Sequence, residues 1–275
     1  MAKEARSKAQ PKSQSKDKSK GHSKTHPKKG EQSEFIMPIV DVLLESPSYA
    51  FDHFAEQFQK KWMVTIGPHR EENAMGIMVD GRVVGCTLVP SPVKDTGVMQ
   101  EAKDNELWPD AEDRVLAHKA HLRVTLTREG DPVAAHVIIT KVICSLLQQK
   151  NVVGVYLRPG LYEPAYYTKC AESLMTKKLP TELWVNVNSL DAGSSGFSFY
   201  TSGMEKFGKS EFEIVDSTKN FIDSLYFLKG LVQTTLEKNI KYKDGDTVGD
   251  ESGSKVKLSV SKGVKIKGTT IKIDM

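Results

Sequence analysis

The order of apolar patterns in the first half of the chain is its most restrictive feature. Each segment shows either the alternation of a half-buried strand or the three-to-four residue spacing of an amphipathic helix. In chain order they predict a strand at 36–44, a helix at 51–62, strands at 76–79 and 83–89, a helix at 110–119 and a strand at 121–126. This β-α-β-β-α-β order is typical of a split βαβ, or ferredoxin-like, unit.

Two local signals support these assignments. Asp80-Gly81 separates two strand-like runs, and because this dipeptide accommodates the positive φ angles of a type I′ turn, we expect a tight hairpin. In the helix at 51–62, Phe54 and Phe58 lie on the apolar face, whereas His53 lies on the polar face. We therefore expect both phenylalanines in the core.

The second half contains the same kinds of element in another order. Asp131-Pro132 predicts a capped helix start, which is followed by an apolar run to Leu147. The further expected elements are strands at 152–157, 183–187, 197–200 and 212–215, helices from Pro164 and over 220–237, and a lysine-rich edge meander at the C-terminus. The pattern predicts an α+β protein with antiparallel or mixed sheets, in which residues 34–275 form one domain or two halves that meet near residue 130.

Positive charge is concentrated at the N-terminus. The chain of 275 residues carries a net charge of +4, but residues 1–33 hold ten basic and three acidic side chains, so this tail carries +7 and the rest of the chain −3. The tail has no aromatic residue and no periodic apolar pattern, which predicts a disordered Lys/Ser-rich segment. Such a segment either contacts a polyanion weakly and without specificity or only solvates the domain. The candidate polyanion contacts are Lys12, Lys16, Lys18, Lys20, Lys24, Lys28 and Lys29.

The remaining sequence excludes several classes of protein. No stretch reaches the ~20 apolar residues of a membrane span, and the basic start is not followed by the apolar segment of a secretory signal. Cys86, Cys144 and Cys170 have neither disulfide nor metal-site spacing, so we expect packing residues of a cytoplasmic protein. Because no phosphate loop, nucleophile elbow or zincin helix occurs, we expect no cofactor.

Two histidines form the sharpest candidate for chemistry. His118 and His121 have a spacing that could present two imidazoles to a metal, with Asp110, Glu112 or Asp113 as a third, carboxylate ligand. Trp108 could form the wall of a small polar pocket beside them. However, the expected helix ends before His121, which would turn the rings apart and leave both to bond backbone or carboxylate groups. Metal binding, acid–base catalysis and a structural role all stay open.

A second candidate is a cluster of tyrosines with one arginine. Tyr156, Arg158, Tyr162 and Tyr166 surround Pro159-Gly160. These residue types are enriched at binding hot spots, but they also pack loops in proteins that bind nothing there. The cluster is therefore a candidate binding surface, for which the expected partner is an unidentified protein.

Six motifs occur in an order that resembles a known family. They are Trp108-Pro109-Asp110, His118-Lys119-Ala120-His121, Gly154-Val155-Tyr156, Leu183-Trp184-Val185 and the segments 203–211 and 243–249. Together they are similar to the family catalogued as domain of unknown function 4261, over roughly residues 36–275. The resemblance implies a mostly bacterial, intracellular α+β protein. It implies no reaction, cofactor or partner.

Three functions from different classes remain open. We favour a non-enzymatic binding or interaction module, because no catalytic signature occurs in the sequence. The first alternative is a metal-dependent or acid–base enzyme centred on His118 and His121. The second is a polyanion-tethered protein that acts through the basic residues of the tail.

Overall fold

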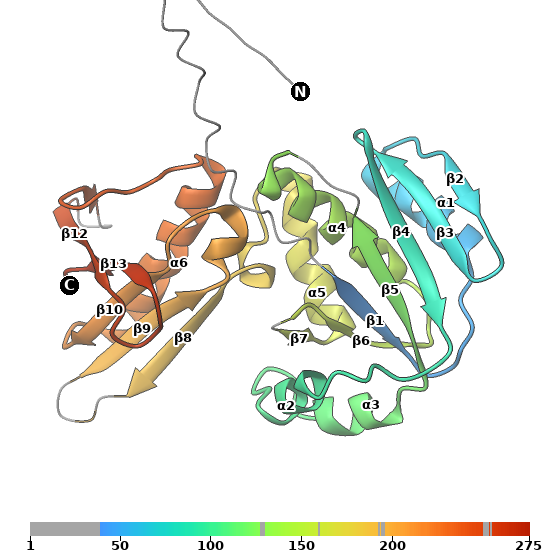
Figure 1. Ribbon diagram of the computed structural model, residues 1–275, viewed down its shortest axis with the longest axis horizontal. Helices are drawn as coiled ribbons and strands as arrows, with labels where there is room; N and C mark the ends of the chain where they lie inside the picture. The colour runs from blue at the N-terminus through green and yellow to red at the C-terminus, as the bar shows by residue number, and fades with distance from the viewer. Residues whose placement is uncertain are drawn as a thin grey trace, which may run out of the picture. The chain divides into compact units, whose positions relative to one another are not determined.

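A computed structural model gives the arrangement of the chain (Figure 1). It describes residues 39–126, 130–158, 160–191, 193, 196–249, 253 and 255–275. The predicted disordered tail, with all of its lysines, lies outside these residues. The described elements all belong to one unit, Glu34–Met275.

Seven strands form the first sheet, in the order β2-β3-β4-β5-β1-β6-β7, and every neighbouring pair is antiparallel. The strands are β1 (Val40–Leu44), β2 (Pro68–Arg70), β3 (Ala74–Val79), β4 (Arg82–Val89), β5 (Ala120–Leu126), β6 (Val152–Tyr156) and β7 (Leu161–Tyr162). All five residues of β1 are buried, because β5 and β6 pair with its two edges and helices cover both of its faces.

The first sheet contains the predicted ferredoxin-like unit. In chain order the unit consists of β1, α1 (Phe51–Trp62), β4, β5, α4 (Pro132–Leu146) and β6. Its four strands are neighbours in the sheet in the order β4-β5-β1-β6. The predicted β-α-β-β-α-β character is therefore confirmed, but with other elements. The central strands are β4 and β5 rather than those predicted at 76–79 and 83–89, the second helix is α4, and the last strand is β6 rather than the strand predicted at 121–126. The helix expected at 110–119 is α3 (Ala111–Ala117), which is inserted with α2 (Gly97–Lys103) between β4 and β5.

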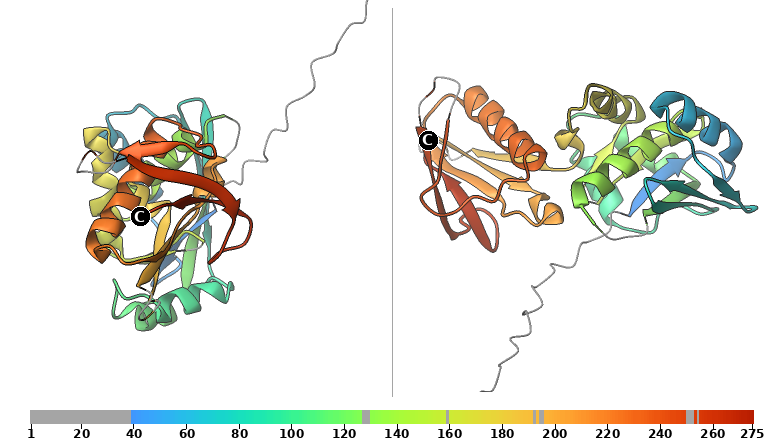
Figure 2. Two further views of the ribbon diagram at one scale, coloured as in Figure 1. Left: turned by 90° about the vertical axis from the view of Figure 1, so that its left-hand side faces the viewer. Right: turned by 90° about the horizontal axis from the view of Figure 1, so that it is seen from above.

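Helices cover both faces of this sheet. On one face α1, α4 and α5 (Pro164–Ala171) pack their apolar side chains into the main core. On the other face α2 and α3 form a smaller core with Leu43, Val153 and Tyr156 of the strands. Figures 1 and 2 show α2 and α3 apart from the other helices, at one end of the sheet. Asp41 and His121, considered below, lie on this second face, because they alternate along their strands with Val42 and Leu122 of the main core.

The second sheet has six strands in the order β11-β12-β13-β10-β9-β8. They are β8 (Asn186–Asp191), β9 (Phe197–Ser202), β10 (Phe212–Ser217), β11 (Thr247–Gly249), β12 (Lys255–Lys262) and β13 (Thr269–Ile273). Because β10 and β13 are parallel and the other pairs antiparallel, the sheet is mixed. Helix α6 (Phe221–Glu237) lies along this sheet (Figure 2), and Asn220 caps it by accepting hydrogen bonds from two amides of the first turn.

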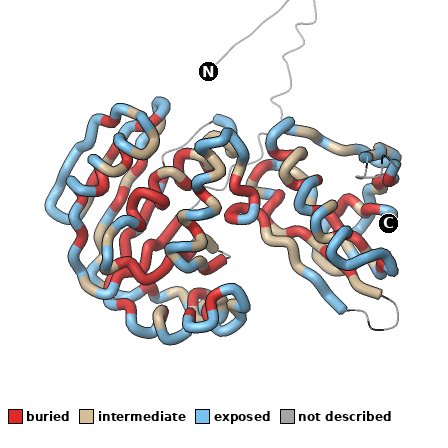
Figure 3. The backbone as a smooth tube through the Cα atoms, turned by 180° about the vertical axis from the view of Figure 1, so that it is seen from behind, coloured by how far each residue is buried: buried red, intermediate tan, exposed pale blue. Residues whose placement is uncertain are grey.

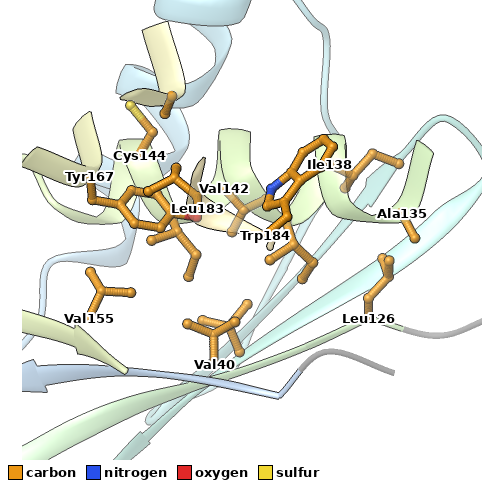
Figure 4. Packing of buried hydrophobic residues seen from close by; sticks show 14 of the residues in the cluster. Val40, Leu126, Ala135, Ile138, Val142, Cys144, Val155, Tyr167, Leu183 and Trp184 are labelled. Atoms are coloured by element: carbon orange, nitrogen blue, oxygen red, sulfur yellow. The ribbon is translucent and has the colours of Figure 1, made fainter. Parts of the chain in front are cut away.

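The main core runs through residues of both sheets. Trp184 and Leu183 lie against Ile138 and Val142 of α4 (Figure 4), and the Trp184 indole nitrogen donates a hydrogen bond of 2.9 Å to Thr140 Oγ1. Figure 3 shows the buried residues inside the helices and strands, with exposed residues along the connections. The predicted core positions Phe54 and Phe58 are both fully buried.

The strands change sheets later in the chain than the sequence indicated. The last strand of the first sheet ends at Tyr162, and the first strand of the second sheet begins at Asn186. Gly130 lies between β5 and α4, and the strands before and after it belong to the same first sheet. A division into halves near residue 130 stays a prediction, and the topology favours a boundary between 163 and 185. The strand expected at 183–187 begins at Asn186, because a 3₁₀ turn at Thr181–Leu183 places Trp184 in the core.

The cysteines have the surroundings expected of packing residues. Cys86 and Cys144 are buried and Cys170 is half-buried, and none of the three is in a disulfide. Burial raises the pKa of Cys86 to about 12 and that of Cys170 to about 11, which disfavours the reactive thiolate. Among the described residues, no helix combines the length and apolar character needed to cross a membrane.

Candidate functional site

The two candidate histidines form hydrogen bonds to the main chain of the loop that contains Ser91 and Val93, and they do not face a common ligand site. His118 follows α3 in extended backbone, where its Nε2 accepts a hydrogen bond of 2.9 Å from the Val93 amide and its Nδ1 contacts the Val115 carbonyl. His121 lies on β5, and its Nδ1 bonds the Ser91 carbonyl at 2.8 Å. Three of the four ring nitrogens are therefore bonded to the main chain. In the part of the chain that the structure describes, no three His, Cys, Asp or Glu side chains are grouped so that they could hold a metal ion.

Trp108 and Asp110 do not join the histidines in a pocket. Trp108 is buried in the smaller core, and its ring lies so close to Gly154 of β6 that a Cβ there would come within 3.0 Å of it. Glycine at this position lets the indole approach the strand closely. Asp110 is exposed at the start of α3, where its side chain makes no capping hydrogen bond.

A buried carboxylate that the sequence analysis did not single out lies beside His121. Asp41 is fully buried in the middle of β1. Its oxygens accept hydrogen bonds from Arg123 Nε at 3.0 Å and Arg158 Nη2 at 2.6 Å, and His121 Nε2 lies 3.9 Å away. The strand register brings these groups together, because Asp41 lies opposite Arg123 on β5 and Tyr156 on β6. The one signal in the sequence is a single acidic residue within the apolar run 39–44.

Arg158 connects Asp41 to a second carboxylate. Its Nε donates a hydrogen bond of 2.7 Å to Asp95, which also accepts one of 3.2 Å from the Tyr156 hydroxyl. The Arg158 guanidinium lies 4.7 Å from the centre of the Tyr156 ring, and it lowers the pKa of Asp95 by hydrogen bonding. We call Asp41, Asp95, His121, Arg123, Tyr156 and Arg158 the Asp41 cluster. Its two carboxylates balance its two guanidinium groups.

Two polar atoms of the Asp41 cluster are less well satisfied. His121 Nε2 and Arg158 Nη1 are buried and have no hydrogen-bond partner among the described atoms. Burial is the main cause that lowers the pKa of His121, so the neutral imidazole is favoured, with its proton on the Nδ1 that faces the Ser91 carbonyl. The cluster is thus a charged network that ties together β1, β5 and the end of β6.

The other half of the predicted tyrosine surface lies elsewhere, in a cleft of about 1300 Å³. Tyr162 on β7 and Tyr166 on α5 line it with their rings parallel, at a centroid distance of 6.2 Å and an interplanar angle of 4°. Residues of the α2–α3 connection, β8 and α6 complete the lining. We call this the tyrosine cleft. Tyr156 and Arg158, which were predicted to share a surface with Tyr162 and Tyr166, do not line it, although β6 and β7 are paired.

Acidic side chains outnumber basic ones in the tyrosine cleft. The lining contains the carboxylates of Glu101, Asp104, Glu106, Glu182 and Asp223 and the ammonium groups of Lys178, Lys219 and Lys229. None of the five carboxylates forms an ion pair with a described residue. Burial and the negative charge of Asp104 raise the pKa of Glu101. A cation placed here would relieve this repulsion.

A serine on α6 adds an unsatisfied polar atom to the cleft. Ser224 is fully buried and lines the cleft, and its Oγ has no hydrogen-bond partner among the described residues. Buried hydroxyl groups are usually paired, so this oxygen is an exception, although neighbouring atoms cover it completely. Nothing in the sequence distinguished Ser224 from the other polar residues of α6.

The comparisons with known proteins add a family and no activity. Residues 200–274 match the family model described as Domain of unknown function (DUF4261). Neither the curated proteins nor the solved structures include a significant match to the chain. The matched segment runs from the end of β9 to the end of β13. It includes the part of α6 that lines the tyrosine cleft and none of the Asp41 cluster.

Proposed function

We propose that this chain, whose residues 200–274 match the DUF4261 family model, is a binding module whose tyrosine cleft takes a basic polypeptide segment of a partner protein. The observation that carries this proposal is the set of five carboxylates without ion-pair partners around the stacked Tyr162 and Tyr166 rings. Tyrosine faces and carboxylates both attract lysine and arginine side chains.

The size of the cleft also supports a polypeptide ligand. A volume of about 1300 Å³ exceeds the roughly 300–1,000 Å³ of pockets that enclose small molecules. The lining is mixed, with Val187 and Phe227 beside the charged residues, which suits a chain with both apolar and basic side chains.

The alternative of an enzyme centred on His118 and His121 has less support. A general base needs a free nitrogen within reach of its substrate. Both nitrogens of His118 contact main-chain atoms, and the single unbonded nitrogen of His121 is buried beside Asp41. We also propose a cytoplasmic location, which the three unpaired cysteines support.

A peptide-binding titration tests the proposal. The probe is a fluorescent peptide in which lysine alternates with threonine, and the control peptide has glutamate in place of lysine. We expect saturable binding of the lysine peptide only, weakening as salt rises. The double variant Glu101→Gln/Asp104→Asn should bind about tenfold more weakly, a loss of about 1.4 kcal/mol. The matched control Glu56→Gln, on the exposed side of α1, should bind like the wild-type chain.

Acid should weaken the binding in a way that identifies Glu101. The pKa of Glu101 is raised, so its negative charge is lost at a higher pH than that of an ordinary glutamate. As the pH is lowered, the affinity should therefore begin to decrease while the pH is still above 4.5. In Asp104→Asn this decrease should begin at a lower pH, because the negative charge that raises the pKa of Glu101 is absent. Equal binding of both peptides, or no effect of the double variant, would refute the proposed function.

A further inference from the structure

The four edges of the two sheets differ in how they are protected. Edge strands expose unpaired backbone groups, and proteins usually keep them short or place proline or lysine on them. Strand β2 has three residues and begins with Pro68, β7 has two residues and β11 has three. Strand β8 has six residues, Asn-Val-Asn-Ser-Leu-Asp, with neither proline nor lysine. Among the described strands, β8 is thus the long edge without such protection.

The backbone of β8 is paired on one side only. Each of its residues from Asn186 to Asp191 lies opposite a residue of β9 in an antiparallel register. In such a pair, alternate residues direct their N–H and C=O groups away from the partner strand. Within the described residues, no other strand pairs with β8 and no main-chain hydrogen bond reaches its outer edge. Three of its six residues therefore offer both a donor and an acceptor outward.

The same strand forms part of the tyrosine cleft. Asn186, Val187 and Asn188 line the cleft together with Tyr162 and Glu182. Figure 1 shows β8 as the outermost strand of the second sheet. Residues of the free edge and carboxylates without ion-pair partners among the described residues thus line one cleft.

We propose that the basic segment binds by strand addition, as a seventh strand paired to the free edge of β8. This inference rests on the proposed function, since it specifies how the ligand of that cleft is held. The six residues of β8 would pair with a segment of about six residues, about 20 Å long. Backbone hydrogen bonds then supply sequence-independent affinity, and the cleft selects the side chains.

Strand addition also defines which sequences the cleft prefers. In an added strand, alternate side chains point to the same face. One set faces the carboxylates and tyrosine rings of the cleft, and the other set faces away. The partner segment should therefore be an extended stretch with lysine or arginine at every second position and no proline. A helical basic peptide of the same composition cannot form these backbone bonds.

Backbone N-methylation of the lysine–threonine peptide separates this inference from the proposed function. One modified peptide carries N-methyl groups on alternate residues, and a second carries them on the intervening residues. Only one of these two sets donates to β8 in a given register, so one peptide should bind at least tenfold more weakly while the other keeps nearly the affinity of the unmodified peptide. Equal affinities for all three peptides would overturn strand addition and leave the cleft proposal intact. No binding of the unmodified peptide would overturn both.

Hydrogen exchange of the wild-type chain provides the second readout. On addition of the unmodified peptide, three alternate amides between Asn186 and Asp191 should exchange at least tenfold more slowly. The intervening amides already bond β9 and should change little. Amides of the edge strand β11 serve as the internal control, because that strand does not line the cleft. Slower exchange in α6 or α5 alone, with β8 unchanged, would overturn the inference.

Discussion

The Asp41 cluster and the tyrosine cleft both contain carboxylates and tyrosines, but among the described residues these carboxylates are ion-paired only in the Asp41 cluster. In the Asp41 cluster, a fully buried carboxylate is bonded by two arginines, and the opposite charges are equal in number. In the tyrosine cleft, five carboxylates have no ion-pair partner in the described structure and face an open volume. The difference teaches that pairing and exposure, rather than residue type, separate charges that support the fold from charges available to a ligand.

The largest expected effect is the loss of the buried charge. Asp41→Asn should lower the free energy of unfolding by about 3 kcal/mol, because it leaves Arg158 and Arg123 without their shared anion. The measurement is urea denaturation at neutral pH, with Glu56→Gln as the exposed control. A change below about 0.5 kcal/mol would place Asp41 with the cleft carboxylates and remove the distinction between the two regions.

Glu213 is a second buried carboxylate, on β10 of the second sheet, and its contribution to stability should depend on pH. It is fully buried and accepts hydrogen bonds from the amides of Val264, Lys265 and Ile266, from Thr270 and from Lys272. These bonds outweigh burial and lower its pKa from 4.5 to about 2. The stability that the folded carboxylate contributes is therefore present above pH 4.5 and is lost as the pH falls toward 2.

Urea titrations of Glu213→Gln and the wild-type chain across this range test the point. The stability difference should be largest above pH 4.5 and should shrink steadily toward pH 2. A difference that does not vary with pH would show that the carboxylate charge contributes nothing beyond the shape of the side chain.

His121 should make a smaller contribution to the pH dependence of stability. Its pKa is lowered by burial, whereas that of Glu213 is lowered by hydrogen bonds. Because the pKa of His121 is lowered from 6.5, the unfolded chain binds a proton more readily than the folded chain. Stability should be complete above pH 6.5 and should decrease as the pH falls below it. His121→Gln should remove this part of the slope when the two unfolding curves are subtracted. If protonation instead strengthened the contact to Asp41, the subtracted curve would rise toward acid.

The smallest effect on stability should come from the tyrosine cleft. Asp104→Asn should change the free energy of unfolding by less than about 0.5 kcal/mol, because the exposed side chain has no ion-pair partner among the described residues. It should nevertheless weaken the binding of the lysine peptide. A large loss of stability in this variant would mean that the cleft carboxylates support the fold, as Asp41 does.

Signals within a few residues of one another predicted much of the local structure. Asp80 and Gly81 both have positive φ angles, 48° and 75°, between β3 and β4, as the hairpin dipeptide indicated. Asp131 caps α4 by accepting hydrogen bonds from the amides of Val133 and Ala134. Such elements depend on backbone geometry and short-range periodicity, which the sequence contains directly.

The composition of the two candidate sites, in contrast, depends on contacts between residues that are distant in the chain. His118 and His121 are close in sequence, but the end of α3 and the start of β5 direct them to separate atoms of one loop. Tyr156 and Tyr162 are also near in sequence, yet one joins the Asp41 cluster and the other the cleft. Proximity along the chain therefore grouped residues that the fold separates.

Local periodicity was enough to predict the α+β class, ferredoxin-like character and the buried face of the helix that carries Phe58. Which elements form the ferredoxin-like unit depends on the strand order. Only the tertiary structure decided which charges are paired. Asp41 bonds Arg123 and Arg158, which are 82 and 117 residues away in the chain. Asn186 of β8 likewise lines the same cleft as Glu101 and Asp104, although it is distant from them in sequence. Contacts of this kind arise from strand order and register, which no local pattern encodes.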